Sequence, residues 1–340
     1  MTLGCFLALS SRRTAFPRNH GRIHAMEGVY KQAGNTIDYT PESAVSAGQV
    51  LQLPDGRAAV ASQDIAAGEL GAVQVTGIVE IAKTTGIVLL PGGKAFWDHS
   101  ANKAHFKTAN DRDFYAGVVQ VQAASADTSV RVALNVQPVY LLDIARDPCT
   151  TAITGTAAAE GFGRPKRVGG SHKFLITATN EAQKVDLLSN QGFAPSANAI
   201  VEARINVVSD GSGSAVDVSV GVANATHGTD ADSITESCFV HLDANNANIN
   251  LESDDGTTEV AATDSTIDYT EGTPFEVWID MRDPSDIQIY IDGVLALGST
   301  VFKLNAATGP LKLLVHVEKT SSTDTYELDI DWLRARISEQ

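Results

Sequence analysis

The chain has 340 residues, 43% of them hydrophobic, which is enough for about two domains with real cores. Its formal net charge is −16, and residues 143–340 alone hold 30 acidic and 13 basic residues. Such an acidic chain is repelled by nucleic-acid phosphates and by anionic membranes, so neither is expected as a partner. The cysteines Cys5, Cys149 and Cys238 lie too far apart in the sequence to indicate a metal site or a disulfide framework.

Residues 1–25 differ from the rest of the chain, because they hold four arginines and no acidic residue. Their apolar stretch is short and precedes the arginines, which is the reverse of a secretory signal. We expect the natural chain to begin at Met26 and residues 1–25 to be a non-native or disordered extension. The alternative is a basic arm that contacts an acidic partner.

Residues 26–142 form a series of short apolar stretches, each closed by a Gly, Pro or Asp turn. The expected strands are 34–39, 50–53, 58–61, 70–81, 87–90, 95–98, 104–108, 114–121 and 129–136. This many short strands in so few residues predict a small β-barrel or β-sandwich.

Residues 143–170 are rich in Thr, Ala and Gly and are expected to be a linker into a second β domain, 171–340. Phe275, Val277 and Ile279 alternate with polar residues, as in a strand with one buried face. The expected strands are 173–179, 199–208, 215–223, 238–243, 248–251, 275–280, 287–291, 312–318 and 326–337. The whole chain is therefore predicted to be all-β, with two domains.

Several stretches of the first domain carry a family resemblance: NTIDYTP (35–41), SAGQVLQL (46–53) and IAAGELGAVQVTGIVEI (65–81), followed by AFWD, FYAGVV and VRVALN. Their order resembles the capsid cement, or head decoration, proteins of tailed phages. The resemblance implies a virion protein on the outer capsid surface, made in the host bacterial cytoplasm. It also implies binding to the major capsid protein, bridging of neighbouring capsomers, a homotrimer, and neither catalysis nor a cofactor. The capsid contacts expected on this basis are Tyr30, Ile37 and Tyr39.

The second domain ends on ELDIDWLRARI, and an alternating hairpin closes at Asp292-Gly293. These features resemble concanavalin-like jelly-roll β-sandwiches. The resemblance implies an outward-facing domain that either contacts host surface glycans or simply covers the shell. Trp278 and Trp332 lie opposite the apolar positions of their strands, so they are candidates for a glycan platform, or else pack between sheets.

The alternative function is a carbohydrate-binding adhesin or a glycoside hydrolase. Glu327, Asp329 and Asp331 alternate along the last strand and so share one face, a spacing that paired catalytic carboxylates use. Because this strand closes the domain, a solvated acidic face without catalysis is the preferred interpretation. The turn acids Asp254-Asp255 and Asp283 with Asp286 offer oxygens to Ca²⁺, but hydrated loops are expected there and no metal is predicted.

Overall fold

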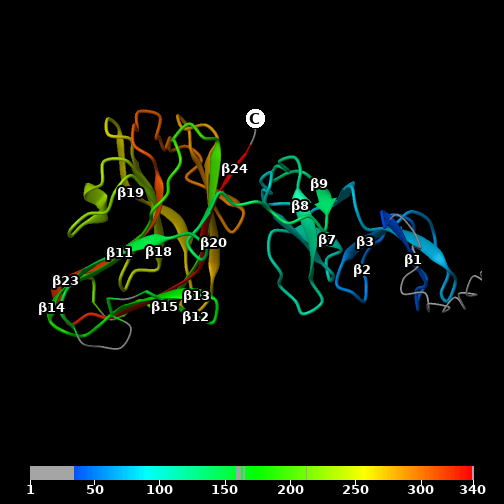
Figure 1. The fold of residues 1–340 in the computed structure, drawn as a ribbon, viewed down its shortest axis with the longest axis horizontal. Coiled ribbons are helices and arrows are strands. Elements are labelled where there is room, and N and C mark those ends of the chain that lie inside the picture. Colours follow the sequence, from blue (N-terminus) through cyan, green and yellow to red (C-terminus); the bar gives the residue numbers. More distant parts are fainter. Residues whose placement is uncertain (1–33, 158–161, 164, 212, 339–340) are drawn as a thin grey trace, which may run out of the picture.

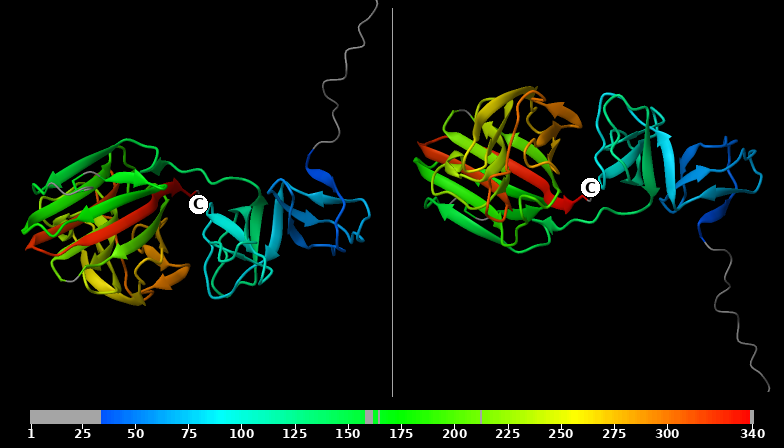
Figure 2. Two further views of the ribbon diagram at one scale, coloured as in Figure 1. Left: turned by 90° about the horizontal axis from the view of Figure 1, so that it is seen from below. Right: turned by 90° about the horizontal axis from the view of Figure 1, so that it is seen from above.

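The computed structural model describes residues 34–157, 162–163, 165–211 and 213–338. These residues form an all-β protein with four antiparallel sheets and one short 3-10 turn, Ala231–Ser233 (η1). A narrow N-terminal body lies beside a larger sandwich, and an extended segment joins the two (Figures 1 and 2). No helix among the described residues is long and apolar enough to cross a bilayer. The start at Met26 lies outside the described residues.

The first sheet has four strands in the order β1-β4-β3-β2, so β1 lies at an edge. A small apolar core that includes Val45, Ile65 and Val73 packs against it. The strands are β1 (Thr36–Tyr39), β2 (Val50–Gln52), β3 (Ala58–Ala61) and β4 (Gly71–Gln74).

The second sheet has five strands in the order β5-β9-β8-β6-β7 and a separate core. Asn135, which follows β9 and has a left-handed φ of 59°, connects the two sheets through hydrogen bonds. Its amide donates to the carbonyls of Ala58 and Val75 and accepts from the N–H of Ala58. The strands are β5 (Ile78–Ala82), β6 (Lys94–Asp98), β7 (Lys103–His105), β8 (Phe114–Val119) and β9 (Ser129–Leu134).

Two of the strands expected in this part are not single regular strands in the structure. The run 70–81 is divided by Gly77, whose φ of 96° suits glycine, so β4 and β5 enter different sheets. The stretch 87–90 is no regular strand. Leu89 makes a single bridge to Ala123, and the N–H of Val88 donates to the carbonyl of Gly293 in the sandwich. This apolar stretch therefore packs at the contact between the N-terminal part and the sandwich.

The C-terminal part is a jelly-roll β-sandwich of two large sheets. The eight-stranded sheet contains β10 (Leu142–Asp143), β12 (Lys166–Val168), β13 (Ser171–Ile176), β15 (Ala199–Ser209), β20 (Phe275–Met281), β21 (Gln288–Ile291), β22 (Val294–Ala296) and β24 (Tyr326–Ile337). The seven-stranded sheet contains β11 (Cys149–Thr154), β14 (Glu181–Ser189), β16 (Val216–Ala223), β17 (Ser237–Asp243), β18 (Asn248–Asp254), β19 (Glu259–Asp268) and β23 (Lys312–Ser322).

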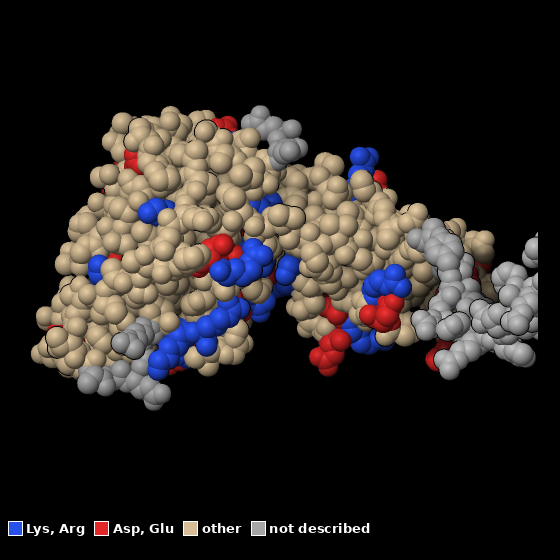
Figure 3. Space-filling view, viewed as in Figure 1, with Lys and Arg blue, Asp and Glu red and all other residues tan. Residues whose placement is uncertain are grey.

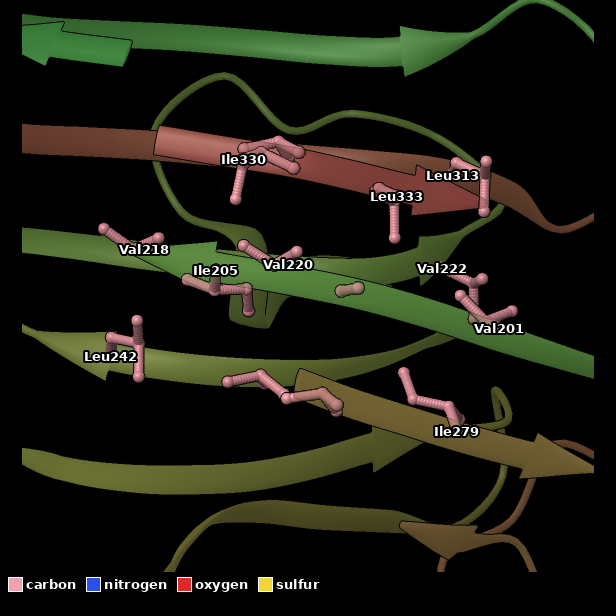
Figure 4. Packing of buried hydrophobic residues seen from close by; sticks show 14 of the residues in the cluster. Val201, Ile205, Val218, Val220, Val222, Leu242, Ile279, Leu313, Ile330 and Leu333 are labelled. Atoms are coloured by element: carbon pink, nitrogen blue, oxygen red, sulfur yellow. The ribbon is translucent and has the colours of Figure 1, made fainter. Parts of the chain in front are cut away.

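The core of the sandwich is built from every second residue of the facing strands. Ile205 of β15 lies near Val218 and Val220 of β16 in the opposite sheet, and Val201 of β15 lies near Val222 (Figure 4). The strand period of two puts the alternate residues on the outer faces, where polar side chains lie. The outer faces are thus the surfaces on which sites can form.

Residues 143–170, expected to be a linker and domain entry with room for one edge strand, contain more strand than that. β11 and β12 lie within 143–170 and extend the seven- and eight-stranded sheets, and β10 pairs Leu142 with Ala335. We propose on this pairing that the second domain begins near residue 142.

A fragment of residues 171–340 is expected to be less stable than one of residues 136–340. The shorter fragment lacks β10, β11 and β12, which leaves β14 as an unprotected edge strand that can pair with other chains. Thermal denaturation and sedimentation velocity of both fragments check this. Equal melting temperatures and equally monodisperse sedimentation would contradict it.

Candidate functional site between the two parts

The outer face of the eight-stranded sheet carries both tryptophans singled out in the sequence. Strand register places Trp332 of β24 beside Arg204 of β15, and Trp278 of β20 beside Glu202 of β15. The N-terminal part packs on this face, because Trp278, Ile200 and Tyr290 complete the core of its five-stranded sheet. The tertiary structure thus brings the two tryptophans together at the junction.

A cavity of about 60 Å³ lies at this junction, with room for about two water molecules. Both tryptophans line it, together with Leu90 and Phe106 of the N-terminal part. The charged side chains around it are Lys94, Lys107, Arg204, Arg334, Arg336, Glu202 and Glu276. The cavity is therefore basic in an otherwise acidic chain, and its size suits a small anionic group rather than a whole sugar ring.

Glu202 is the centre of a buried ion network. Its two carboxylate oxygens accept hydrogen bonds from Arg334 and Arg336, at 3.0 and 2.9 Å, and a further one from the Tyr140 hydroxyl at 3.1 Å. Burial acts to raise the pKa of Glu202, but the two guanidiniums outweigh it and hold that pKa below its usual range. Arg336 also donates to the carbonyl of Pro91, so this network joins the two parts.

Trp332 is half-buried and surrounded by cations. Lys94 lies 5.8 Å, Arg204 5.3 Å and Arg334 4.6 Å from its ring centroid. Burial and the neighbouring Arg334 lower the pKa of Lys94. Trp278 is only 7% exposed, with the ring of Phe106 edge-on to it at 5.3 Å. Trp278 is therefore buried within the junction, and the ring of Trp332 lies nearer to solvent.

Glu276 is a second buried carboxylate of this face, 3.9 Å from Arg204. Burial raises its pKa to about 7, and the charges of Glu202 and Asp292 act in the same direction, while Arg204 and Arg334 oppose them. Because the folded-state pKa of Glu276 is above its unfolded value, the folded chain keeps Glu276 protonated below neutral pH. The free energy of unfolding therefore falls as pH rises from about 4.5 to 7, where the unfolded chain ionises Glu276 more easily than the folded chain.

We expect Glu276→Gln to remove this pH dependence. Relative to the variant, the wild type should lose about 2–3 kcal/mol between pH 5 and pH 8, since one pKa unit corresponds to about 1.4 kcal/mol. Urea unfolding of both proteins at the two pH values measures the difference. Parallel stability curves would show that Glu276 ionises normally in the folded chain.

The acidic triplet of the last strand is paired rather than simply solvated. Lys173 of β13 pairs with Glu327 and lies 3.4 Å from Asp329, while Arg204 lies 3.0 Å from Asp331. All three carboxylates share the outer face, as expected, but each is held by a cation of a neighbouring strand. The expectation of a freely solvated face is wrong in this respect, and the pairing offers no free nucleophile.

The basic side chains of this sheet are concentrated in one band. Figure 3 shows Lys and Arg atoms along the sandwich over β12 and β13 and toward the junction, on a surface that is otherwise mostly uncharged. Lys166 and Arg167 of β12 and Lys173 of β13 belong to these strands. The outer face of the eight-stranded sheet therefore suits anionic ligands despite the net charge of the chain.

Two of the three expected capsid contacts, Ile37 and Tyr39, lie at the end of the molecule away from the sandwich. Ile37 and Tyr39 are half-buried on β1 and pack against the small core of the first sheet, while Tyr30 lies outside the described residues. Thr36 and Asp38 are the exposed side chains of this edge strand.

The turn acids considered for Ca²⁺ accept hydrogen bonds from groups within their own turns. Asp255 accepts from the N–H groups of Thr257 and Thr258, and Asp283 accepts from Ser285. Among the described residues, the groups that could hold a metal ion both include His241, together with Asp217 and Asp243 or with Asp232 and Glu252. Sequence reasoning missed them, although the alternation in β17 puts His241 and Asp243 on one face.

Residues 31–134 match the phage cement protein family. The matched stretch is 104 of the 340 residues. This stretch coincides with the two small sheets, β1 to β9. The resemblance to cement proteins is therefore confirmed for the N-terminal part. No curated protein matches the chain.

Solved structures similar to this chain include a carbohydrate recognition domain of Emp47p, at 12% identity and a TM-score of 0.39, covering 56% of this chain and 89% of that one. An endo-acting O-glycanase of the human gut microbiota shares 10% identity with a TM-score of 0.42, covering 59% and 100%. The carbohydrate-binding module CBM66 of Bacillus subtilis shares 10% identity with a TM-score of 0.30, covering 48% and 94%. These values are too low to transfer a ligand or an activity.

Proposed function

We propose that this chain is a phage capsid decoration protein without catalytic activity. Its N-terminal part would bind the major capsid protein, and its jelly-roll sandwich would project from the outer surface of the virion. The observation that carries the proposal is the cement-family match over residues 31–134, which covers both small sheets. In Figure 2 the four-stranded sheet lies on the side of the N-terminal part that faces away from the sandwich, which supports a contact with the shell at that end.

The edge strand β1 is the capsid contact that we favour. An edge strand offers unpaired backbone N–H and C=O groups that can extend a partner's sheet. Ile37 and Tyr39 would support this strand from the core side, and Thr36 and Asp38 would face the shell.

A second contact is needed to bridge neighbouring capsomers. Leu70, which precedes β4, is 70% exposed, and Ile78, the first residue of β5, is 62% exposed. Exposed apolar side chains of this size support a further interface, either with a second capsomer or with other copies in a homotrimer.

Co-sedimentation of the full chain with capsids that lack it tests this proposal. We expect saturable binding and greater heat resistance of the loaded capsids. Asp38→Arg on the edge strand should weaken binding at least 10-fold, whereas Asp111→Arg, an exposed change in the other small sheet's loops, should not. Failure of the wild type to bind such capsids at micromolar concentration would overturn the proposed function.

For the sandwich, we propose contact with host surface glycans through Trp332. The basic cavity beside this ring would accept the acidic substituent of a sugar, while the ring packs on the sugar face. Acidic oligosaccharides should bind more tightly than matched neutral ones, and Trp332→Ala and Arg204→Gln should each reduce that difference. Equal binding of both kinds of oligosaccharide would exclude this role.

A further inference from the structure

The outer face of the seven-stranded sheet carries polar side chains that the proposed function does not use. Strand register places His316 of β23, Ser219 of β16 and His241 of β17 in one row. A loop, residues 224–236, lies over this face, since Ala231 and Ile234 pack on Phe239 and Leu314. His241 is therefore only 7% exposed, although it lies on the outside of a sheet.

The imidazole of His241 lies among carboxylates from three elements. Its Nδ1 is 3.3 Å from Asp232 Oδ1, on the η1 turn of the loop, and 3.8 Å from Glu252 Oε1, on β18. On the other side of the ring, Nε2 is 3.1 Å from Asp243 Oδ1. The ligand atoms of His241, Asp232 and Glu252 all lie within 4.8 Å of one another.

Glu252 points to a missing partner in this cluster. It is 6% exposed, and its buried Oε1 has no hydrogen-bond partner among the described residues. The Nδ1 atom of His241 likewise has no hydrogen-bond partner there. Buried polar atoms are nearly always satisfied. An ion between these two atoms would satisfy both, and the alternative without an ion is a charged imidazole paired with Asp232 at 3.3 Å.

We propose that Nδ1 of His241, Oδ1 of Asp232 and Oε1 of Glu252 bind a divalent transition-metal ion of the zinc type. A tetrahedral ion with ligands about 2.1 Å away separates neighbouring ligand atoms by about 3.4 Å. The observed 3.3 and 3.8 Å from the imidazole to the two carboxylates bracket that separation. The fourth position would hold water on the side of the exposed Asp232.

A second shell for such an ion is also in place. When His241 binds metal through Nδ1, its Nε2–H donates to Asp243, and Asn250 donates to the other oxygen of Asp243 at 3.2 Å. Metal-bound histidines are usually oriented by a carboxylate in this way. The nitrogen ligand favours zinc-type ions over Ca²⁺ and Mg²⁺, which prefer oxygen.

The ion would fasten the loop to the sheet. Asp232 is the ligand from the loop, and Asp230 holds its η1 turn by accepting from the N–H of Asp232 at 3.0 Å. His241 and Glu252 come from adjacent strands of the rigid sheet. Binding of the ion is therefore predicted to protect residues 224–236 from proteolysis.

Zn²⁺ titration of the chelator-treated full chain by calorimetry tests the site, with Co²⁺ absorption as an independent signal of four-coordination. We expect one equivalent to bind, and Glu252→Gln and Asp232→Asn to weaken it at least 10-fold. Asp243→Asn should weaken it about 10- to 100-fold through the orientation of His241. Asp217→Asn, on the Nε2 side of the ring, and Asp268→Asn, at an exposed position, should leave the affinity within about twofold.

Circular dichroism of each variant separates loss of binding from loss of folding. If a ligand variant does not fold, His241→Gln is titrated in its place and is expected to lose the binding. Saturable binding that is lost in Asp217→Asn but kept in Glu252→Gln would overturn the assignment of these ligands. The absence of stoichiometric binding in the wild type would show that His241 is an imidazolium held between carboxylates without a metal.

Discussion

Glu202→Gln is expected to destabilise the chain by about 3–5 kcal/mol, the cost of leaving a buried charge without its partner. Glu202 is 5% exposed and pairs with Arg334 and Arg336, which are equally inaccessible. The neutral amide leaves two buried guanidiniums without a counter-ion. Urea unfolding followed by tryptophan fluorescence measures the loss.

Glu80→Gln is the matched control, because Glu80 also pairs with an arginine. Its partner, Arg131, lies 3.6 Å away, and both side chains are more than half exposed. Exposed pairs contribute at most about 1 kcal/mol. Similar small losses in the two variants would mean that the Glu202 network is solvated in solution and does not join the two parts.

Trp278→Ala is expected to cost about 3–5 kcal/mol, as for other buried aromatic residues, and to uncouple the two parts of the chain. Trp278 belongs to the sandwich but lies in the core of the five-stranded sheet, against Phe106. Its removal opens a cavity in the junction. Unfolding should then change from one transition to two, and the extended segment 136–141 should be cut faster by proteases.

Val294→Ala on β22, two strands away from β20 in the same sheet, provides the comparison, since Val294 is 46% exposed. Such a surface substitution should change stability by no more than about 0.5 kcal/mol and leave a single transition. A single, unshifted transition in Trp278→Ala would show that the two parts unfold independently of this contact.

Strands with one clearly apolar face were predictable from the sequence. β16 and β24 have nearly the expected bounds, because their alternation is strong. β14 and β19 were not expected. The outward positions of β14 hold the buried charges Lys184 and Asp186, and β19 is a mostly exposed edge strand. In both strands, neighbours that are distant in the sequence compensate for a weak local pattern.

The two tryptophans show which features of the site could be predicted from the sequence and which could not. Both tryptophans were expected on the outer face, and that placement is observed. Alternation accounts for Trp278. Trp332 has the parity of the inward-facing Leu328 and Ile330, and it reaches the outer face because a β-bulge shifts the register between Arg204 and Ile205. Nothing local indicated that residues 87–90 and Phe106 would cover one ring and that cations would surround the other. The pairing of Glu327 with Lys173 was equally hidden, because 154 residues separate them.

The sequence by itself determined the all-β class, the cement-like module and which side chains face outward, because strand alternation and turn residues act over a few neighbours. Only the tertiary structure decided the junction cavity, the Glu202 network and the grouping of Asp232, His241 and Glu252. These depend on register between strands far apart in the chain, where a shift of one residue would turn every side chain to the other face.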